Sequence, residues 1–336
     1  MKSIPVIGMG WAAGDNAGAF CDSKSIWDNI IIKKGPSGIL TETIAPHLPN
    51  TSMRLVDRQS LLLAASVKLA YGCLDGLEIP DADGTGIYHG SCTAAVNNII
   101  KYEGTGIEKG FNTVNPMEFP NTVANVTASR AGIWYKLKER VIALSEGVTS
   151  GLDAIGLACE HLGSGIGAAF LAGASEELPF WIQDNCELNM FEGSVVFLLC
   201  NPDLAISNKY GIMGSVEEFA SASIEPGDNT GKRTAEYVLA LADKWGLDME
   251  DSACLISGCW NSQALNDVLN SAMGKKSGAW SSYLHQCGTG QPWEGYTLNS
   301  MLDFAEALSG GQSNKKNYII VSSDRIGLIS CLLLKI

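Results

Sequence analysis

The 336-residue sequence has a formal net charge of −13, with 46% hydrophobic and 18% charged residues. This length and composition support a large globular core, in two domains or one duplicated unit, and argue against extensive disorder. The acidic balance makes nucleic acids and anionic membranes poor partners, because binding them requires a basic surface.

The ten cysteines form no C-x-x-C pair, and most of them lie in apolar runs. In a chain of this length the pattern indicates buried thiols in a reducing compartment rather than a disulfide framework or a zinc site. No apolar run reaches the roughly 18 residues that a membrane span requires. Residues 1–8 also lack the apolar core of a signal peptide. We therefore expect a soluble cytoplasmic protein without a metal or cofactor.

Short apolar segments that predict strands alternate with amphipathic segments that predict helices. Strands are predicted at residues 5–8, 85–89, 141–144, 168–173, 194–200, 254–257, 317–322 and 326–334. Helices are predicted at residues 60–73, 150–162, 234–245 and 296–308. Apolar residues at 152, 155, 159 and 162 make one buried stripe of the second helix. The segments 104–125 and 224–232, rich in Gly, Pro and Asn, predict loops.

This alternation predicts an α/β fold whose strands are mostly central and buried. Two halves, residues 1–201 and 202–336, are expected within one compact unit. The glycines Gly8 and Gly10, with Gly14 after them, have the wrong spacing for a dinucleotide fingerprint and are interpreted as a turn.

Three segments carry a family resemblance. Residues 115–125 read NPMEFPNTVAN, residues 143–156 read ALSEGVTSGLDAIG, and residues 168–177 read AAFLAGASEE. In this order they resemble the β-ketoacyl synthase family of the thiolase superfamily, and the GLDA run is similar to the chain-length factors of type II polyketide synthases. The FEGS turn at 191–194 extends the resemblance. It implies a duplicated five-layer α-β-α-β-α fold and dimerisation through the strand at 141–144.

The resemblance also implies a missing nucleophile. The family places a Cys at the junction of a strand and a helix, where the helix N-terminus favours the thiolate that accepts the acyl chain. In this sequence Val148 occupies that position. Valine offers neither a nucleophile nor a hydrogen-bonding group, so acyl transfer and decarboxylation are both unsupported.

The other family positions have changed as well. The first family His corresponds to Cys259 in ISGCWNS, and the family Lys corresponds to Trp280. The second His corresponds to His285, and the gating Phe corresponds to Arg325. Departures at several separate positions indicate lost catalysis. Glu176 and Glu192 fall on structural positions of the family and are interpreted as buried, hydrogen-bonded carboxylates.

We therefore hypothesise a chain-length-factor subunit that forms a heterodimer with an active ketosynthase, which would condense substrates carried by acyl carrier protein. This chain would form part of the tunnel that sets the length of a polyketide or polyene. Four residues are candidates for the tunnel wall: Val96, Ile100, Tyr102 and Phe119. Because this chain is acidic, as acyl carrier protein is, the carrier is expected to dock on the partner.

Two alternatives stay open. One is a divergent stand-alone acyltransferase or condensing enzyme that uses Cys259 or Cys92 with His285, since a neighbouring His can activate a thiol. A small buried residue is the favoured interpretation of Cys92, and a hydrogen-bonded relic that of His285. The other alternative is a scaffold that stabilises the ketosynthase without shaping product length.

Overall fold

The strands of the chain form one continuous sheet. The computed structural model describes residues 1–14, 16–19, 38–74, 76–180, 190–227, 229–248, 250–257, 281–284, 296–309, 315–324 and 326–336. The strand order is β4-β3-β5-β6-β1-β7-β11-β10-β8-β9, with β2 paired to β1. The strands are β1 (Ile4–Ala13), β2 (Asn16–Ala19), β3 (Thr85–Gly90), β4 (Val141–Leu144), β5 (Ala169–Glu176), β6 (Gly193–Cys200), β7 (Gly214–Ser223), β8 (Ser252–Ser257), β9 (Ser281–Leu284), β10 (Asn317–Ser323) and β11 (Leu328–Lys335).

Helices connect and cover these strands. They are α2 (Thr41–Ile44), α3 (Arg58–Gly72), α4 (Val96–Lys109), α5 (Val126–Trp134), α6 (Ser150–Gly163), α8 (Pro202–Ser207), α9 (Thr230–Lys244) and α11 (Leu298–Leu308). Short 3-10 helices lie at η1 (Ala45–His47), η2 (Ala82–Gly84), η3 (Phe111–Thr113) and η4 (Pro116–Thr122). In the described part of the chain, no helix is long and apolar enough to cross a membrane.

The sheet repeats one topology twice. Outward from the β1–β7 pairing, one set of strands runs β1, β6, β5, β3, β4 and the other runs β7, β11, β10, β8, β9. In both sets the first two pairings are antiparallel and the next two are parallel. Among the described strands, the two sets pair with each other through Ile4–Val6 of β1 and Gly214–Val216 of β7. This repetition confirms the predicted duplicated α/β fold, and the boundary between residues 201 and 202 stays a prediction.

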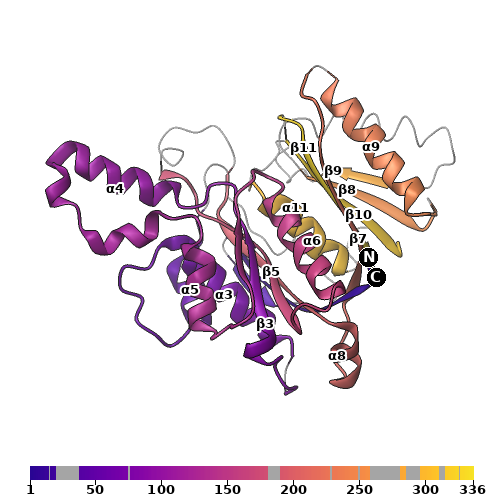
Figure 1. Cartoon of the computed structure of the whole chain (residues 1–336), viewed down its shortest axis with the longest axis horizontal. Helices are drawn as coiled ribbons and strands as arrows, with labels where there is room; N and C mark the ends of the chain where they lie inside the picture. Colours follow the sequence, from indigo (N-terminus) through magenta and orange to yellow (C-terminus); the bar gives the residue numbers. More distant parts are fainter. Residues whose placement is uncertain are drawn as a thin grey trace.

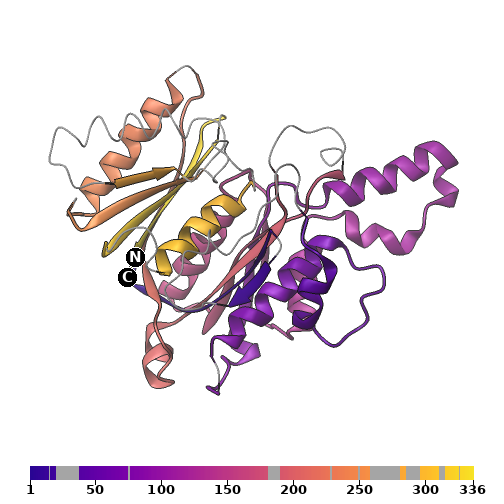
Figure 2. The same ribbon diagram turned by 180° about the vertical axis from the view of Figure 1, so that it is seen from behind.

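Two helices occupy the middle layer. Figures 1 and 2 show α6 and α11 between the two sets of strands. Their apolar faces share one core cluster with strands of both sets, and the ring centroids of Phe197 (β6) and Phe304 (α11) are 4.4 Å apart. The outer face of one set packs on α3 and α5, and that of the other set packs on α9. The resulting order of layers is α-β-α-β-α.

Close packing explains a glycine pair that the sequence analysis interpreted wrongly. Gly8 and Gly10 lie inside β1 rather than in a turn. A Cβ on Gly10 would lie 2.1 Å from the carbonyl oxygen of Ser66, and one on Gly8 would lie 2.5 Å from that of Ala70. The glycines therefore let the backbone of α3 approach the strand.

Other differences from the predicted elements have local causes. The predicted loop at 104–125 begins with the last turns of α4, and the predicted loop at 224–232 overlaps the start of α9. Gly104 and Gly106 made the end of α4 look like a loop in the sequence. Gly106 is required there, because a Cβ would lie 2.5 Å from the ring of Phe111. Strand β7 was not predicted because its sequence, GSVEEFASAS, lacks an apolar run.

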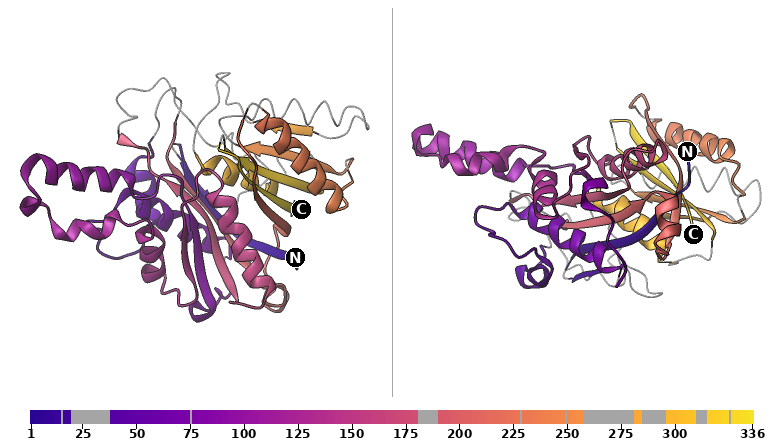
Figure 3. Two further views of the ribbon diagram at one scale, coloured as in Figure 1. Left: turned by 45° about the horizontal axis from the view of Figure 1, so that its top comes forward. Right: turned by 60° about the horizontal axis from the view of Figure 1, so that its bottom comes forward.

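Residues 96–122 form a projecting arm, which α4 leads outward and η3 and η4 bring back. Figure 3 shows α4 extending away from the body of the protein in both views. The arm is held together by its own contacts, including the edge-to-face ring pair of Tyr102 and Phe119 with centroids 6.0 Å apart. Its main exposed apolar side chains are those of Ile99, Ile100, Ile107, Phe111, Met117 and Phe119.

Candidate functional site

The junction between β4 and α6 is the place where the resemblance puts a nucleophile. Strand β4 is the outermost strand of its set, and the chain turns after it through Gly147, whose φ is +97°. Val148 follows in the turn, only 7% exposed, and Ser150 begins α6. Val148 therefore lies between β4 and the N-terminus of α6, and its equivalence to the family's nucleophile position stays a prediction.

Hydrogen bonds hold the junction in place. The hydroxyl of Ser322 in β10 donates to the carbonyl oxygen of Val148 at 2.9 Å. The hydroxyl of Ser150 donates to the carbonyl of Gly147 at 2.7 Å and accepts from the amide of Glu146 at 2.8 Å. The first turn of α6 is also joined to α11, because the amide of Gly151 donates to Oγ1 of Thr297 at 2.7 Å.

This junction has the electrostatic environment of a reactive thiol, but the side chain of Val148 carries no reactive atom. A helix N-terminus stabilises negative charge, which would favour a thiolate at this point. The side chain present is aliphatic. The neighbouring hydroxyl of Ser150 is engaged by the turn, and Thr149 is buried and bonded to the carboxyl of Asp153. Positions 148–150 therefore offer no available nucleophile.

Four of the family positions that the sequence analysis compared, Cys259, Trp280, His285 and Arg325, lie outside the described residues. The strand that precedes Cys259 is β8, which ends at Ser257. The hydroxyl of Ser257 donates to the carboxylate of Asp303 in α11. Within the described ranges, no three His, Cys, Asp or Glu side chains gather in a way that could hold a metal ion.

Cys92, the alternative nucleophile, lies in the turn between β3 and α4 and is partly buried. Its backbone amide donates to the carboxylate of Glu176. This carboxylate also accepts hydrogen bonds from Ser91 and Thr93, and Glu176 is 1% exposed. Burial raises the pKa of Glu176 to about 7, and these donors oppose the shift.

Glu192 is the second carboxylate that the sequence analysis placed in the interior. It forms an ion pair with Arg58 at 2.6 Å and accepts from the amide of Ile39 at 2.8 Å. Both glutamates are thus buried and hydrogen-bonded, as predicted.

Sequence analysis missed the larger polar network around these groups. Gln59 donates to Ser91 and to the carbonyl of Ser175, and His89 shares a hydrogen bond of 2.7 Å with the hydroxyl of Ser175. Burial lowers the pKa of His89 to about 3, so this imidazole is neutral in the folded protein at neutral pH. Only the polar residues within otherwise apolar segments could have indicated such a network.

The four tunnel candidates all lie on the arm. Val96 and Tyr102 in α4 are half-buried, whereas Ile100 is 42% exposed and Phe119 in η4 is 56% exposed. The structure therefore brings together two segments that the sequence analysis named separately.

A cavity of about 490 Å³ lies beside the base of the arm. It is lined by Asn97, Asn98, Lys101, Glu177 and Phe180. Burial raises the pKa of Glu177 to about 7, with smaller contributions from the charges of Glu192 and Asp57, while a hydrogen bond with Asn97 opposes the shift.

Comparisons with known proteins agree with this geometry. Residues 33–182 match the family model described as "Beta-ketoacyl synthase, N-terminal domain". A curated relative, 3-oxoacyl-[acyl-carrier-protein] synthase 2 of Vibrio harveyi, is 32% identical over 104 residues, which are 30% of this chain and 25% of that relative. The aligned region thus spans about a quarter of the relative's length.

Solved structures resemble the whole chain. A type II polyketide synthase acyl-carrier protein in complex with its ketosynthase bound to the hexaketide contains a chain with a TM-score of 0.79 and 18% identity, at 99% coverage of both chains. The ishigamide ketosynthase/chain length factor gives 0.77 and 15%, also at 99% coverage of both. A β-ketoacyl synthase from Burkholderia phymatum STM815 gives 0.72 and 17%, covering 100% of this chain and 99% of that one. The chain therefore has the thiolase-like fold of the ketosynthases.

Proposed function

We propose that this chain is a catalytically silent member of the β-ketoacyl synthase family, which pairs with an active ketosynthase and shapes the tunnel that sets the length of a polyketide or polyene. The observation that carries the proposal is the aliphatic side chain of Val148 at the β4–α6 junction. The match over residues 33–182 and the fold shared with a ketosynthase/chain length factor support it.

The chemistry of condensation explains why a partner is needed. An acyl chain is held as a thioester, which requires a sulfur nucleophile at the junction. Val148 supplies no such atom, and the nearby hydroxyl of Ser150 is engaged in the turn. In a heterodimer the partner's thiolate would carry the acyl group, and this chain would contribute part of the wall around it.

Two surfaces favour such a pairing. Strand β4 lies at the edge of the sheet, with Val141 39% exposed. A sheet edge that carries apolar side chains is normally covered by another element or chain. The arm adds further exposed apolar side chains, among them those of Ile107 and Met117. A partner that covers both would bury the arm and turn the ring of Phe119 into tunnel wall.

The charge of the chain assigns carrier docking to the partner. With a net charge of −13, this subunit would repel an acidic acyl carrier protein. The basic docking face therefore belongs to the ketosynthase, and reversing charges there would weaken carrier binding more than the same change in this chain.

Native mass spectrometry tests the proposal. The chain is incubated with an acyl-loaded carrier protein, alone and together with its cognate ketosynthase. We expect a one-to-one heterodimer in which only the ketosynthase gains the acyl mass, because only that subunit has the nucleophile.

An acyl adduct on this chain in the absence of the ketosynthase would overturn the proposal. Repeating the reaction with Cys92→Ala would then identify the reactive thiol. Loss of the adduct would establish an acyltransferase that uses Cys92, and persistence would direct peptide mapping to Cys259.

A further inference from the structure

The arm projects from the body, and each of its two roots is bonded to that body. The outgoing root, residues 91–95, connects β3 to α4, and the returning root, residues 121–125, connects η4 to α5. Just beyond the outgoing root, Asn97 also donates to the carbonyl of Leu178 and accepts from the amide of Phe180. Between them, the arm packs largely on itself, through Tyr102 on Phe119 and Phe111 on Gly106. The direction in which the arm points is therefore set by what holds its roots.

The outgoing root is bound by a buried carboxylate. Glu176, at the end of β5, accepts from the backbone amides of Cys92 and Thr93 and from the hydroxyl of Thr93 at 2.5 Å. It also accepts from the hydroxyl of Ser91 at 3.1 Å. The same hydroxyl accepts from the amide of Ala94 at 2.7 Å. The turn before α4 is thus fixed to the body of the protein by several bonds.

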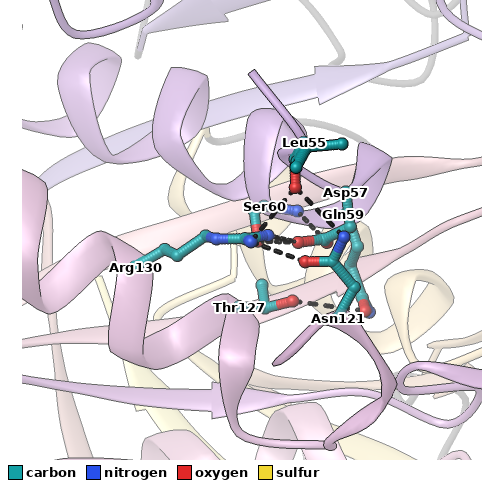
Figure 4. A network of polar contacts seen from close by, with 7 residues as sticks. All are labelled: Leu55, Asp57, Gln59, Ser60, Asn121, Thr127 and Arg130. Carbon is teal, nitrogen blue, oxygen red and sulfur yellow. Dashed lines mark hydrogen bonds and ion pairs between the residues drawn. The ribbon is translucent and has the colours of Figure 1, made fainter. Parts of the chain in front are cut away.

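The returning root is bound by a buried amide. Asn121 is 6% exposed. Its Oδ1 accepts from Nη2 of Arg130 at 2.5 Å, and its Nδ2 donates to the carbonyl of Leu55 at 3.0 Å. Arg130 in turn donates to the carbonyl of Leu55 at 3.2 Å and forms an ion pair with Asp57. Figure 4 shows Asn121 and Arg130 converging on Leu55 and Asp57.

The start of α3 joins the two roots. Asp57 caps this helix, accepting from the amide of Ser60 at 2.8 Å. Two residues on, Gln59 donates to Ser91 of the outgoing root at 2.7 Å, and it accepts from Thr127 of α5 at 3.4 Å. The backbone of α3 therefore joins two sets of polar contacts into one network. Asn121, Arg130 and Asp57 form one set, and Gln59 with the Ser91 turn forms the other.

We propose that this network, which we call the root clamp (Asp57, Gln59, Asn121, Arg130 and Glu176), fixes the direction of the arm and so positions its apolar face for the partner subunit. The part that concerns the partner rests on the proposed function. The part that concerns the arm does not, because the clamp acts within a single chain. Its members are positioning residues, since they reach the pairing surface only through the arm.

Burial supports a positioning role. Asp57, Gln59, Asn121 and Glu176 are each at most 6% exposed. Buried, hydrogen-bonded polar groups contribute little net stability compared with apolar side chains, and in several proteins they restrict the structure to one arrangement. A network of this kind at the base of a projection, away from the middle layer, restricts the direction of that projection.

Hydrogen exchange of the isolated chain, followed by mass spectrometry, tests the clamp. Asn121→Ala removes both hydrogen bonds of the Asn121 side chain and leaves Arg130 paired with Asp57. The matched control is Asn125→Ala, because Asn125 is exposed and its side chain makes no capping bond to α5. We expect Asn121→Ala to speed exchange across residues 96–122 about tenfold and to leave β5 and α6 unchanged. Asn125→Ala should exchange like the unaltered chain.

Affinity for the ketosynthase gives the second readout. We expect Asn121→Ala to raise the dissociation constant of the heterodimer at least tenfold, and Asn125→Ala to leave it unchanged. Unchanged exchange in the arm would overturn the clamp, because the network would then have no effect on the arm. Faster exchange throughout the core would also overturn it, because the network would then only stabilise the fold. If no ketosynthase binds the unaltered chain while the arm still responds selectively, the clamp stands and the proposed function fails.

Discussion

At the scale of single residues, Val148 occupies an environment that would activate a thiol, although it has no thiol itself. The helix N-terminus and the bonds from Ser322 and Thr297 hold this junction firmly. Only the side chain lacks a reactive atom. A thiol placed at this position should therefore experience an activating field although the native residue uses none of it.

Val148→Cys tests this environment. The introduced thiol should have a pKa below the ordinary value of about 8.5, because the N-terminus of α6 stabilises a thiolate. The pH dependence of alkylation by iodoacetamide, followed by peptide mapping, measures it. The native thiols Cys159 and Cys200 should react slowly, because burial raises the pKa of both. Ser145→Cys, in the exposed part of the same turn, is the matched control, and equal pH midpoints for the two thiols would contradict an activating junction.

His89 links a buried residue to the pH dependence of folding. Burial lowers the pKa of His89 to about 3, so between about pH 6.5 and 3 the unfolded chain binds a proton that the folded chain does not. The free energy of unfolding is therefore unaffected by protonation of His89 above about pH 6.5, and it decreases as the pH falls below that value. For one such histidine the loss between pH 7.5 and 5.5 is about 1.4 kcal/mol.

Urea unfolding at these two pH values measures the effect in the native chain and in His89→Gln, whose side chain does not titrate. We expect the native chain to lose about 1.4 kcal/mol more than the variant. The raised pKa of Glu176 acts in both proteins and cancels in this comparison. Identical pH dependences would show that His89 is accessible to protons in the folded state.

At the scale of elements, the arm is where local sequence signals failed. Gly104 and Gly106 favour a loop, yet α4 continues to Lys109. Gly106 is required because the ring of Phe111 occupies the space that a Cβ would take. Such a contact is invisible to helix propensity. By contrast, α6 was predicted within one residue of its observed end, since its apolar stripe is packed in the core as the spacing indicates.

Phe119→Ala tests whether the arm forms tunnel wall. Phe119 is 56% exposed in this chain, and a partner that covers it would make its ring part of an enclosed wall. Removing the ring then opens space, so the heterodimer should release longer products, which liquid chromatography with mass spectrometry would detect. Met117→Ala, in the same 3-10 helix and also exposed, should leave the product length unchanged.

The same assay separates shaping from scaffolding. If substitutions at Val96, Ile100, Tyr102 and Phe119 all leave product length unchanged while the heterodimer still forms, the chain stabilises its partner without setting product length. Such a result would favour the scaffold alternative that the sequence left open.

At the scale of the whole molecule, the sequence was most informative where strands are apolar and buried. Strands β3, β4, β5, β6 and β10 were predicted because their apolar runs reflect burial or close packing. Strand β7 escaped because it pairs on both sides while keeping polar side chains such as Glu217 and Glu218. The root clamp escaped for a related reason, because its members are far apart in the sequence and ordinary in type.

The repeated topology places the first strand, β1, and the last strand, β11, on either side of β7. Val216 of β7 pairs with Ile4 on one side and with Leu334 on the other, and Figure 1 shows the ends side by side. A short linker could therefore close the chain into a ring, and a new opening at the turn near Asn208 would exchange the order of the two halves. Because the strands would keep their neighbours, such a circular permutant should fold to the same architecture. Strand pairing, rather than the order of the strands along the chain, would then determine the fold.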